Sequence, residues 1–196
     1  MGMYSVDTFI SDFATRTMDN LKCVQEHNSR YEVTQLINSL FGLLIVPNEK
    51  FKYRSDNPQK VPDKVFKAES KFYDKLKCEF GRLERENRYY NNYPTKELVS
   101  EIITRFRNAL AHSGKEGLHF LPMEEGREIS SIIFYDTDNS GHEFCAQLSI
   151  EEIRKITMWI SKMYQEIEMK LPEVTIEQYK KQLAKYQRIM RKQYED

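Results

Sequence analysis

The segment spanning residues 95–114 constrains the fold of this chain more than any other stretch. Its apolar residues recur at intervals of three and four, the spacing of one helix face, and Ser113-Gly114 follows as a helix stop. The apolar residues are Val99, Ile103, Phe106 and Leu110. Burial of this face also fixes the positions of four polar residues near the end of the helix, Arg105, Arg107, Asn108 and His112. His112 is expected at the helix end near the surface.

Five further stretches show helical signals and surround a short β-rich region. Three apolar and β-branched runs after Gly114 have hairpin spacing and are expected to be strands: Leu118–Leu121, Ile129–Tyr135 and Phe144–Leu148. The turn at 136–141 joins the last two. This turn has the residue order of a calcium loop, but Gln147 stands where such a loop needs a bidentate Glu. Three helices are expected before the central one: residues 5–27, a second from the capping box at Ser29–Glu32 to a stop at Pro47, and a third from Asp63 to an end at Tyr89–Pro94. Thr95 is expected to cap the central helix. Two more helices are expected after the β-rich region, one from the capping box at Ser149–Glu152 and one from Thr175.

The pattern predicts a mainly α fold, a bundle of five to six helices with a small inserted antiparallel hairpin or sheet at about 118–148. A chain of 196 residues suggests a single domain with a substantial core. We expect residues 1–172 to form this domain and residues 173–196 to form a basic helix packed on it.

Charge is balanced overall but unevenly distributed along the chain. Lys+Arg and Asp+Glu number 30 each. Residues 50–92 hold twelve bases against seven acids, whereas residues 116–152 hold nine acids against one arginine. The basic segment could meet phosphates, or it could be an ordinary solvated helix face. Four lysines of this segment are the candidates for such phosphate contacts: Lys64, Lys67, Lys71 and Lys75.

The remaining composition excludes several classes of protein. Three widely spaced cysteines, Cys23, Cys78 and Cys145, form no CxxC pair or Cys/His cluster, which argues against a metal site and fits a reducing compartment. The longest apolar run, Leu40–Val46, is too short to span a bilayer. With no signal-peptide pattern at the start, we expect a cytoplasmic protein without membrane contact.

The polar residues near the end of the central helix resemble the signature of the HEPN superfamily (higher eukaryotes and prokaryotes nucleotide-binding). That signature is an arginine, four to six residues, and a histidine, often with a polar residue directly after the arginine. Arg107-Asn108 and His112 fit it with four residues between, and Arg105 fits it with six between. Arg16–Leu21 and Tyr31–Asn38 are similar to a plasmid-borne bacterial branch of the superfamily. The resemblance covers roughly residues 5–170.

The resemblance implies a metal-independent endoribonuclease of HEPN type that needs no cofactor and acts in a toxin or phage-defence role. Arg107, Asn108 and His112 are the catalytic candidates, and Arg105 is the reserve arginine. RNA and a second copy of the chain are the implied partners, and a cognate antitoxin or regulatory protein fits the same setting. The alternatives are a non-catalytic HEPN module that binds RNA or nucleotide, and a helical protein-interaction dimer.

The residue types suit RNA cleavage, but their spacing raises a geometric problem. Histidine can move protons near neutral pH, and arginine offers a planar fork of donors that matches phosphate oxygens. At about 100° per residue, Arg105, Asn108 and His112 share one helix face, while Arg107 lies about 140° from His112. In the HEPN superfamily two motif helices meet across a two-fold axis, so an arginine and a histidine from different chains can complete one site.

Overall fold

A computed structural model of the chain describes residues 9–27, 32–52, 71–94, 97–112, 117–122 and 128–168, and single residues between 177 and 188. The continuous ranges hold five helices and one four-stranded antiparallel sheet. The helices are α1 (Phe9–Glu26), α2 (Glu32–Lys52), α4 (Lys71–Arg85), α5 (Leu98–Ala111) and α6 (Ile150–Glu168), and the strands are β1 (Tyr89–Asn91), β2 (Gly117–Pro122), β3 (Ile129–Thr137) and β4 (Glu143–Ser149).

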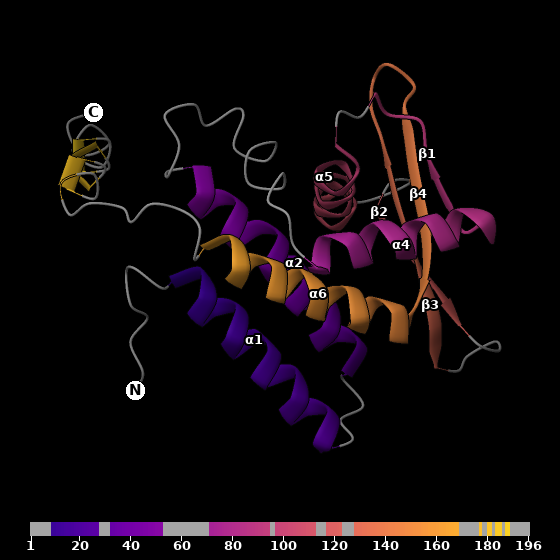
Figure 1. Cartoon of the computed structure of the whole chain (residues 1–196), viewed down its shortest axis with the longest axis horizontal. Coiled ribbons are helices and arrows are strands. Elements are labelled where there is room, and N and C mark those ends of the chain that lie inside the picture. The colour runs from indigo at the N-terminus through magenta and orange to yellow at the C-terminus, as the bar shows by residue number, and fades with distance from the viewer. Residues whose placement is uncertain are drawn as a thin grey trace, which may run out of the picture.

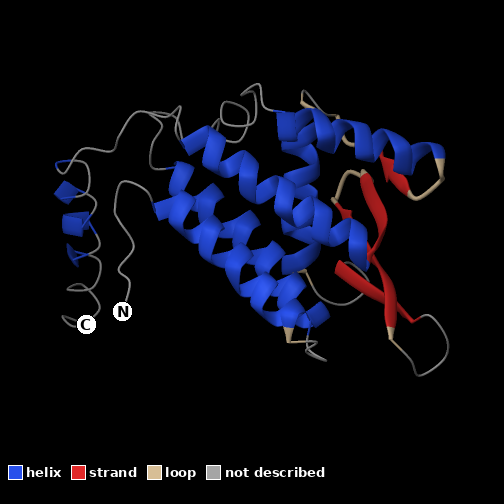
Figure 2. Cartoon of the chain, turned by 60° about the horizontal axis from the view of Figure 1, so that its bottom comes forward, coloured by secondary structure: helices blue, strands red, loops and turns tan. Residues whose placement is uncertain are grey.

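The helices gather on one side of the sheet. α1, α2 and α6 pack against one another, and of these three α6 lies next to the sheet (Figure 1). α5 packs on β2 and β3, α4 packs on β1, and α6 packs on β4, so the sheet is covered by helices on one face (Figure 2). The predicted mainly α fold with a small antiparallel sheet is therefore confirmed.

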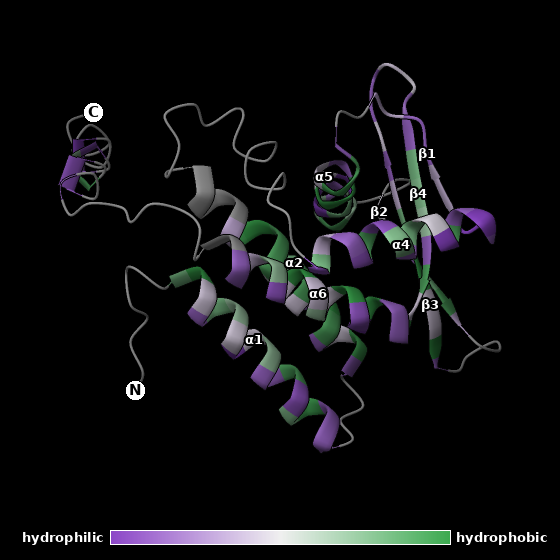
Figure 3. Cartoon of the chain, in the orientation of Figure 1, coloured by the Kyte–Doolittle hydropathy of each residue, from purple (hydrophilic) through white to green (hydrophobic). Residues whose placement is uncertain are grey.

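Apolar side chains of the strands and helices meet between these layers. Along β3 the side chains of Ile132, Phe134 and Asp136 are buried, and they alternate with the half-buried Ile133 and Tyr135. Figure 3 shows hydrophobic and hydrophilic residues following one another along α4 and α6, whose apolar faces turn inward. Phe106 of α5 lies at the centre, with its ring centroid 4.5 Å from that of Phe134 and 5.8 Å from that of Phe80.

The strand order is β1-β4-β3-β2, and every neighbouring pair is antiparallel. The three predicted strands and a hairpin turn between the last two are confirmed, but β3 continues to Thr137, so the turn begins at Asp138 and not at residue 136. The sheet has a fourth strand that the sequence analysis placed at the end of a helix. Residues 89–91 pair with β4, with Tyr89 opposite Ala146, because an edge strand this short is defined by a distant partner and not by a local pattern.

Two predicted helix boundaries are wrong. α2 does not stop at Pro47 but continues to Lys52, with the proline ring buried. Proline has a helix-compatible φ and removes one hydrogen bond, a loss that burial of its ring can offset. The cap of α5 is Glu97, whose carboxylate accepts from the backbone N–H of Ser100 at 2.7 Å, and not Thr95.

The capping box at the start of α6 is confirmed. The backbone N–H of Ser149 donates to Glu152, and that of Glu152 donates to Ser149 Oγ at 3.2 Å. The predicted box at Ser29–Glu32, the start at Asp63 and the cap at Thr175 lie outside the described residues. The single residues described between 177 and 188 are helical and exposed.

Candidate functional site

The site is built at the C-terminal end of α5, where the chain turns back into β2. α5 ends at Ala111, and His112 is its C-cap, with its backbone N–H donating to the carbonyl of Asn108 at 2.9 Å. Gly117 starts β2 with a φ of 109°, and a Cβ there would lie 2.7 Å from the carbonyl oxygen of His112. Glycine at 117 therefore allows the strand to pass directly beside the histidine.

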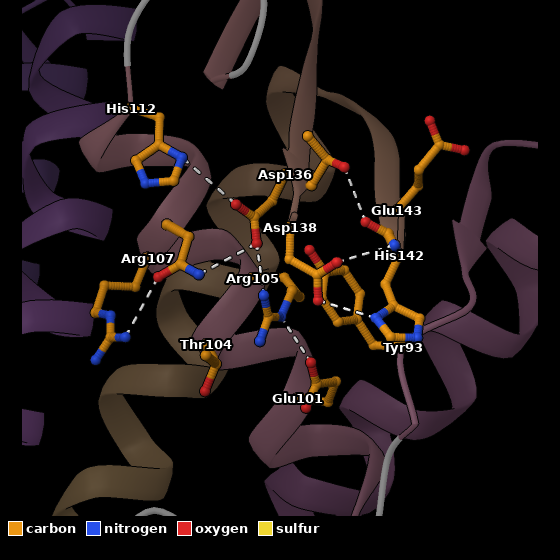
Figure 4. A network of polar contacts seen from close by, with 12 residues as sticks. Tyr93, Glu101, Thr104, Arg105, Arg107, His112, Asp136, Asp138, His142 and Glu143 are labelled. Atoms are coloured by element: carbon orange, nitrogen blue, oxygen red, sulfur yellow. Dashed lines mark hydrogen bonds and ion pairs between the residues drawn. The ribbon is translucent and has the colours of Figure 1, made fainter. Parts of the chain in front are cut away.

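One buried carboxylate collects the polar side chains of α5. Asp136 lies on the helix-facing side of β3, and its side chain is 1% exposed. Its Oδ2 accepts from Arg105 Nη1 at 2.8 Å and from Asn108 Nδ2 at 3.1 Å. Its Oδ1 lies 3.5 Å from Nδ1 of His112, whose side chain is 42% exposed. Figure 4 shows Arg105 and His112 pointing toward Asp136 from α5.

The two arginines of the motif have different surroundings. The Arg105 side chain is 16% exposed, its Nε donates to Glu101 at 2.6 Å, and its guanidinium carbon lies 3.8 Å from the ring centroid of Tyr93. Burial alone would lower the pKa of Arg105, but the charges of Glu101 and Asp136 outweigh burial and raise it. Arg105 is therefore a charged group held by two carboxylates and a ring.

Arg107 points away from Asp136 (Figure 4). Its Nη2 donates to Asn108 Oδ1 at 3.3 Å. Burial raises the pKa of Tyr164 of α6, and the charge of Arg107 opposes this rise. Among the residues that the structure describes, Arg107 forms no ion pair. Asn108 thus links the two sides of the helix, because its amide oxygen accepts from Arg107 and its amide nitrogen donates to Asp136.

A second histidine–aspartate pair lies on the far side of Tyr93. His142 Nδ1 is 2.9 Å from Asp138 Oδ2, and the His142 ring centroid is 5.3 Å from that of Tyr93. Burial and the charge of Asp136 raise the pKa of Tyr93 to about 12, so this phenol stays neutral under Arg105. The backbone N–H groups of Ser140 and His142 both donate to Asp138 Oδ1, which makes this pair part of the hairpin turn.

The structure brings together most of the predicted site. Arg105, Asn108 and His112 share a face of α5, as the helical spacing predicts, and all three contact Asp136. Arg107 lies on another side of the helix. Lys71 and Lys75 are exposed on α4, and each Nζ lies over the ring of Phe72, while Lys64 and Lys67 lie outside the described residues.

Asp136 is the site residue that sequence reasoning missed. The sequence analysis assigned it to the hairpin turn, whereas the structure places it within β3. A signal was present, because the alternation that turns Ile132 and Phe134 inward also turns residue 136 inward. An aspartate at an inward strand position needs buried partners, and the helix that packs on β3 supplies them.

Within the described ranges, no group of three or more His, Cys, Asp and Glu residues is placed to hold a metal ion. Of the helices that the structure describes, none combines the length and apolar character needed to cross a bilayer.

A family model described as HEPN pEK499 p136 matches residues 1–171. The chain therefore belongs to this HEPN family, and the resemblance that the motif indicates is confirmed. Comparison with curated proteins and with solved structures finds no match.

Proposed function

We propose that the protein is a metal-independent endoribonuclease of HEPN type. His112 transfers protons, Arg107 binds the phosphate at the cleavage point, and Asn108 positions Arg107. The observation that carries this proposal is the contrast between the two arginines. Arg105 forms ion pairs with Glu101 and Asp136, whereas Arg107, on the same helix, has no carboxylate partner among the described residues.

These groups suit cleavage through the 2′-oxygen of RNA. The 2′-OH loses its proton and attacks the adjacent phosphorus, the bond to the 5′-oxygen breaks, and that oxygen takes up a proton. The products are a 2′,3′-cyclic phosphate and a 5′-OH. A histidine can accept or donate these protons near neutral pH, and the guanidinium fork stabilises the charge that gathers on the phosphate oxygens. His112 is exposed enough to reach a substrate.

We propose that each active site uses the arginine of one protomer and the histidine of its partner. Arg107 and His112 leave α5 in different directions, and a two-fold axis beside α5 would bring Arg107 of one copy toward His112 of the other. The apolar face of α5 does not itself require a partner, because Val99, Ile103 and Phe106 are buried within their own chain. The separation of the two polar groups therefore carries the dimer proposal.

The activity is tested with purified protein and single-stranded RNA in EDTA, with products identified by end analysis. Wild type should release 2′,3′-cyclic phosphate ends and leave DNA intact, because DNA has no 2′-OH. His112→Ala should cut at least ~100-fold more slowly, the usual scale of general acid–base catalysis. If His112→Ala cleaves RNA at the wild-type rate, a non-catalytic HEPN module that binds RNA or nucleotide replaces this proposal.

Mixing two inactive variants tests the shared site. In a heterodimer of His112→Ala and Arg107→Ala protomers, one site keeps both groups and the other has neither. Random exchange gives about half heterodimers, so about a quarter of the wild-type rate should return. If the two groups act within one chain, no activity returns on mixing.

We propose that the nuclease acts as a toxin or in phage defence, as the family resemblance implies. Induced expression of the wild-type chain should arrest bacterial growth, and His112→Ala at the same protein level should not. Equal growth with both chains would contradict this role while leaving the nuclease assay to decide the chemistry.

A further inference from the structure

The contacts of Asp136 point to a role beyond holding α5 on the sheet. The carboxylate is buried, and its two oxygens have different partners. Oδ2 accepts two hydrogen bonds, from Arg105 and Asn108. Oδ1 is also buried, has no hydrogen-bond partner among the described residues, and faces Nδ1 of His112 at 3.5 Å. A buried acceptor without a donor is costly, so the geometry favours a proton on Nδ1.

We infer that Asp136 is a positioning residue that holds His112 as its Nδ1–H tautomer. The proton on Nδ1 lies toward Oδ1 of Asp136, and Nε2, on the opposite side of the ring, carries the lone pair that exchanges a proton with RNA. A carboxylate that orients a catalytic imidazole in this way also stabilises the imidazolium that forms during the reaction. The catalytic consequence rests on the proposed ribonuclease function, whereas the tautomer can be measured without substrate.

The distance between Asp136 and His112 fits this role. A separation of 3.5 Å exceeds a normal hydrogen bond. Catalytic hydrogen bonds are often long without substrate and tighten in the substrate complex. The carboxylate cannot turn away from His112, because Arg105 and Asn108 both hold Oδ2. The same two donors therefore fix the direction in which Oδ1 points.

These contacts predict the effect of Asp136→Asn. The asparagine amide has one acceptor and one donor end. Arg105 and Asn108 both donate at the Oδ2 position, so the amide oxygen should occupy that position and the NH2 group should face His112. Nδ1 of His112 would then accept a hydrogen bond, and the ring should change to the Nε2–H tautomer. The substitution keeps the shape of the side chain and reverses the proton on the histidine.

Asp138 supplies a matched control on the same hairpin. Its Oδ1 accepts two backbone N–H groups, and its Oδ2 contacts His142 Nδ1 at 2.9 Å. Asp138→Asn should therefore reverse the tautomer of His142 by the same reasoning and leave that of His112 unchanged. The control makes the same chemical change two residues along the chain.

The experiment is a long-range ¹H–¹⁵N correlation spectrum of histidine-labelled protein at a pH where imidazole is neutral, with His112→Gln used for assignment. We expect Nδ1–H at His112 in wild type, Nε2–H in Asp136→Asn, and Nδ1–H in Asp138→Asn. Wild-type His112 in the Nε2–H form, or an unchanged ring in Asp136→Asn, would overturn the assignment. The wild-type spectrum decides the tautomer even where Asp136→Asn folds poorly.

Cleavage kinetics test the consequence for catalysis. Asp136→Asn should lower kcat at least ~100-fold with KM for RNA nearly unchanged, since the change acts on proton transfer and not on substrate binding. Asp138→Asn should match wild type. If His112→Ala abolishes cleavage and Asp136→Asn does not slow it, the positioning role is wrong and the nuclease stands. If wild type does not cleave RNA, the proposed function fails and the spectra still decide the tautomer.

Discussion

Removing the guanidinium of Arg105 is expected to destabilise the domain far more than removing that of Arg107. Arg105→Ala would leave Asp136, whose side chain is 1% exposed, without its charged partner. Breaking one side of a buried ion pair costs about 3–5 kcal/mol, because the remaining charge stays buried. The lost contact with Tyr93 and the lost ion pair with Glu101 would add to this cost.

Arg107→Ala is the matched comparison, two residues along the same helix. Its side chain has no ion pair among the described residues and one hydrogen bond of 3.3 Å to Asn108. Its loss should change the free energy of unfolding by about 1 kcal/mol or less. Urea unfolding followed by far-ultraviolet circular dichroism gives both values, and Arg105→Ala should lower the free energy of unfolding by about 3–5 kcal/mol.

A double-mutant cycle identifies the cause of the Arg105 effect. Arg105→Ala combined with Asp136→Asn should cost less than the sum of the single changes, with a coupling of about 1–3 kcal/mol. Equal stability of the two arginine variants, or no coupling to Asp136, would refute the reasoning. Cleavage should show the opposite order, with Arg107→Ala the more severe change when both proteins are folded.

Three further predictions concern stability, RNA binding and assembly. Hydrogen bonds from Arg88, the Ser149 N–H and Arg82 outweigh burial and lower the pKa of Glu152 from 4.5 to about 2. A depressed folded-state pKa stabilises the domain above pH ~4.5, so Glu152→Gln should lose up to about 3 kcal/mol at neutral pH in urea unfolding, and this loss should vanish as the pH falls toward ~2. Replacing Lys64, Lys67, Lys71 and Lys75 by Gln should weaken RNA binding and reduce the slope of the logarithm of the binding constant against the logarithm of the salt concentration by about 3. Replacing the exposed Lys155 and Lys162 of α6 should leave this slope unchanged. An unaltered slope in the fourfold variant would reject the role of these lysines. Light scattering at micromolar concentration should show a dimer, and a monomer alone would sink the shared site.

Local sequence patterns predicted the elements whose cause is local. The helical spacing of α5 and the capping box at Ser149 depend on residues within a few positions of each other, and both are confirmed. β1 was missed because its pairing with β4 joins Tyr89 to Ala146, and no nearby residue shows that contact. Pro47 was misread because the penalty of a proline depends on what buries it.

In the candidate site, too, the features set by nearby residues could be predicted and the contact between distant residues could not. The face shared by Arg105, Asn108 and His112 follows from the helical repeat alone, and the structure confirms it. The carboxylate that joins these three side chains comes from a strand, and its position depends on how β3 packs on α5. Sequence spacing could therefore identify the helix face, whereas its partner required the tertiary fold.

The arrangement on α5 gives the two arginines of this helix different surroundings. Asp136 is buried, and a buried carboxylate needs a compensating cation, which Arg105 supplies from inside the domain. A guanidinium already bound to two carboxylates has little capacity left for a phosphate. Arg107 lies on another side of the helix, is linked through the amide of Asn108 to Asp136, and has no carboxylate partner among the described residues, so it is the arginine that we propose for the phosphate. Since His112 and Arg107 leave the helix in different directions, we propose that each active site is completed by residues of two chains.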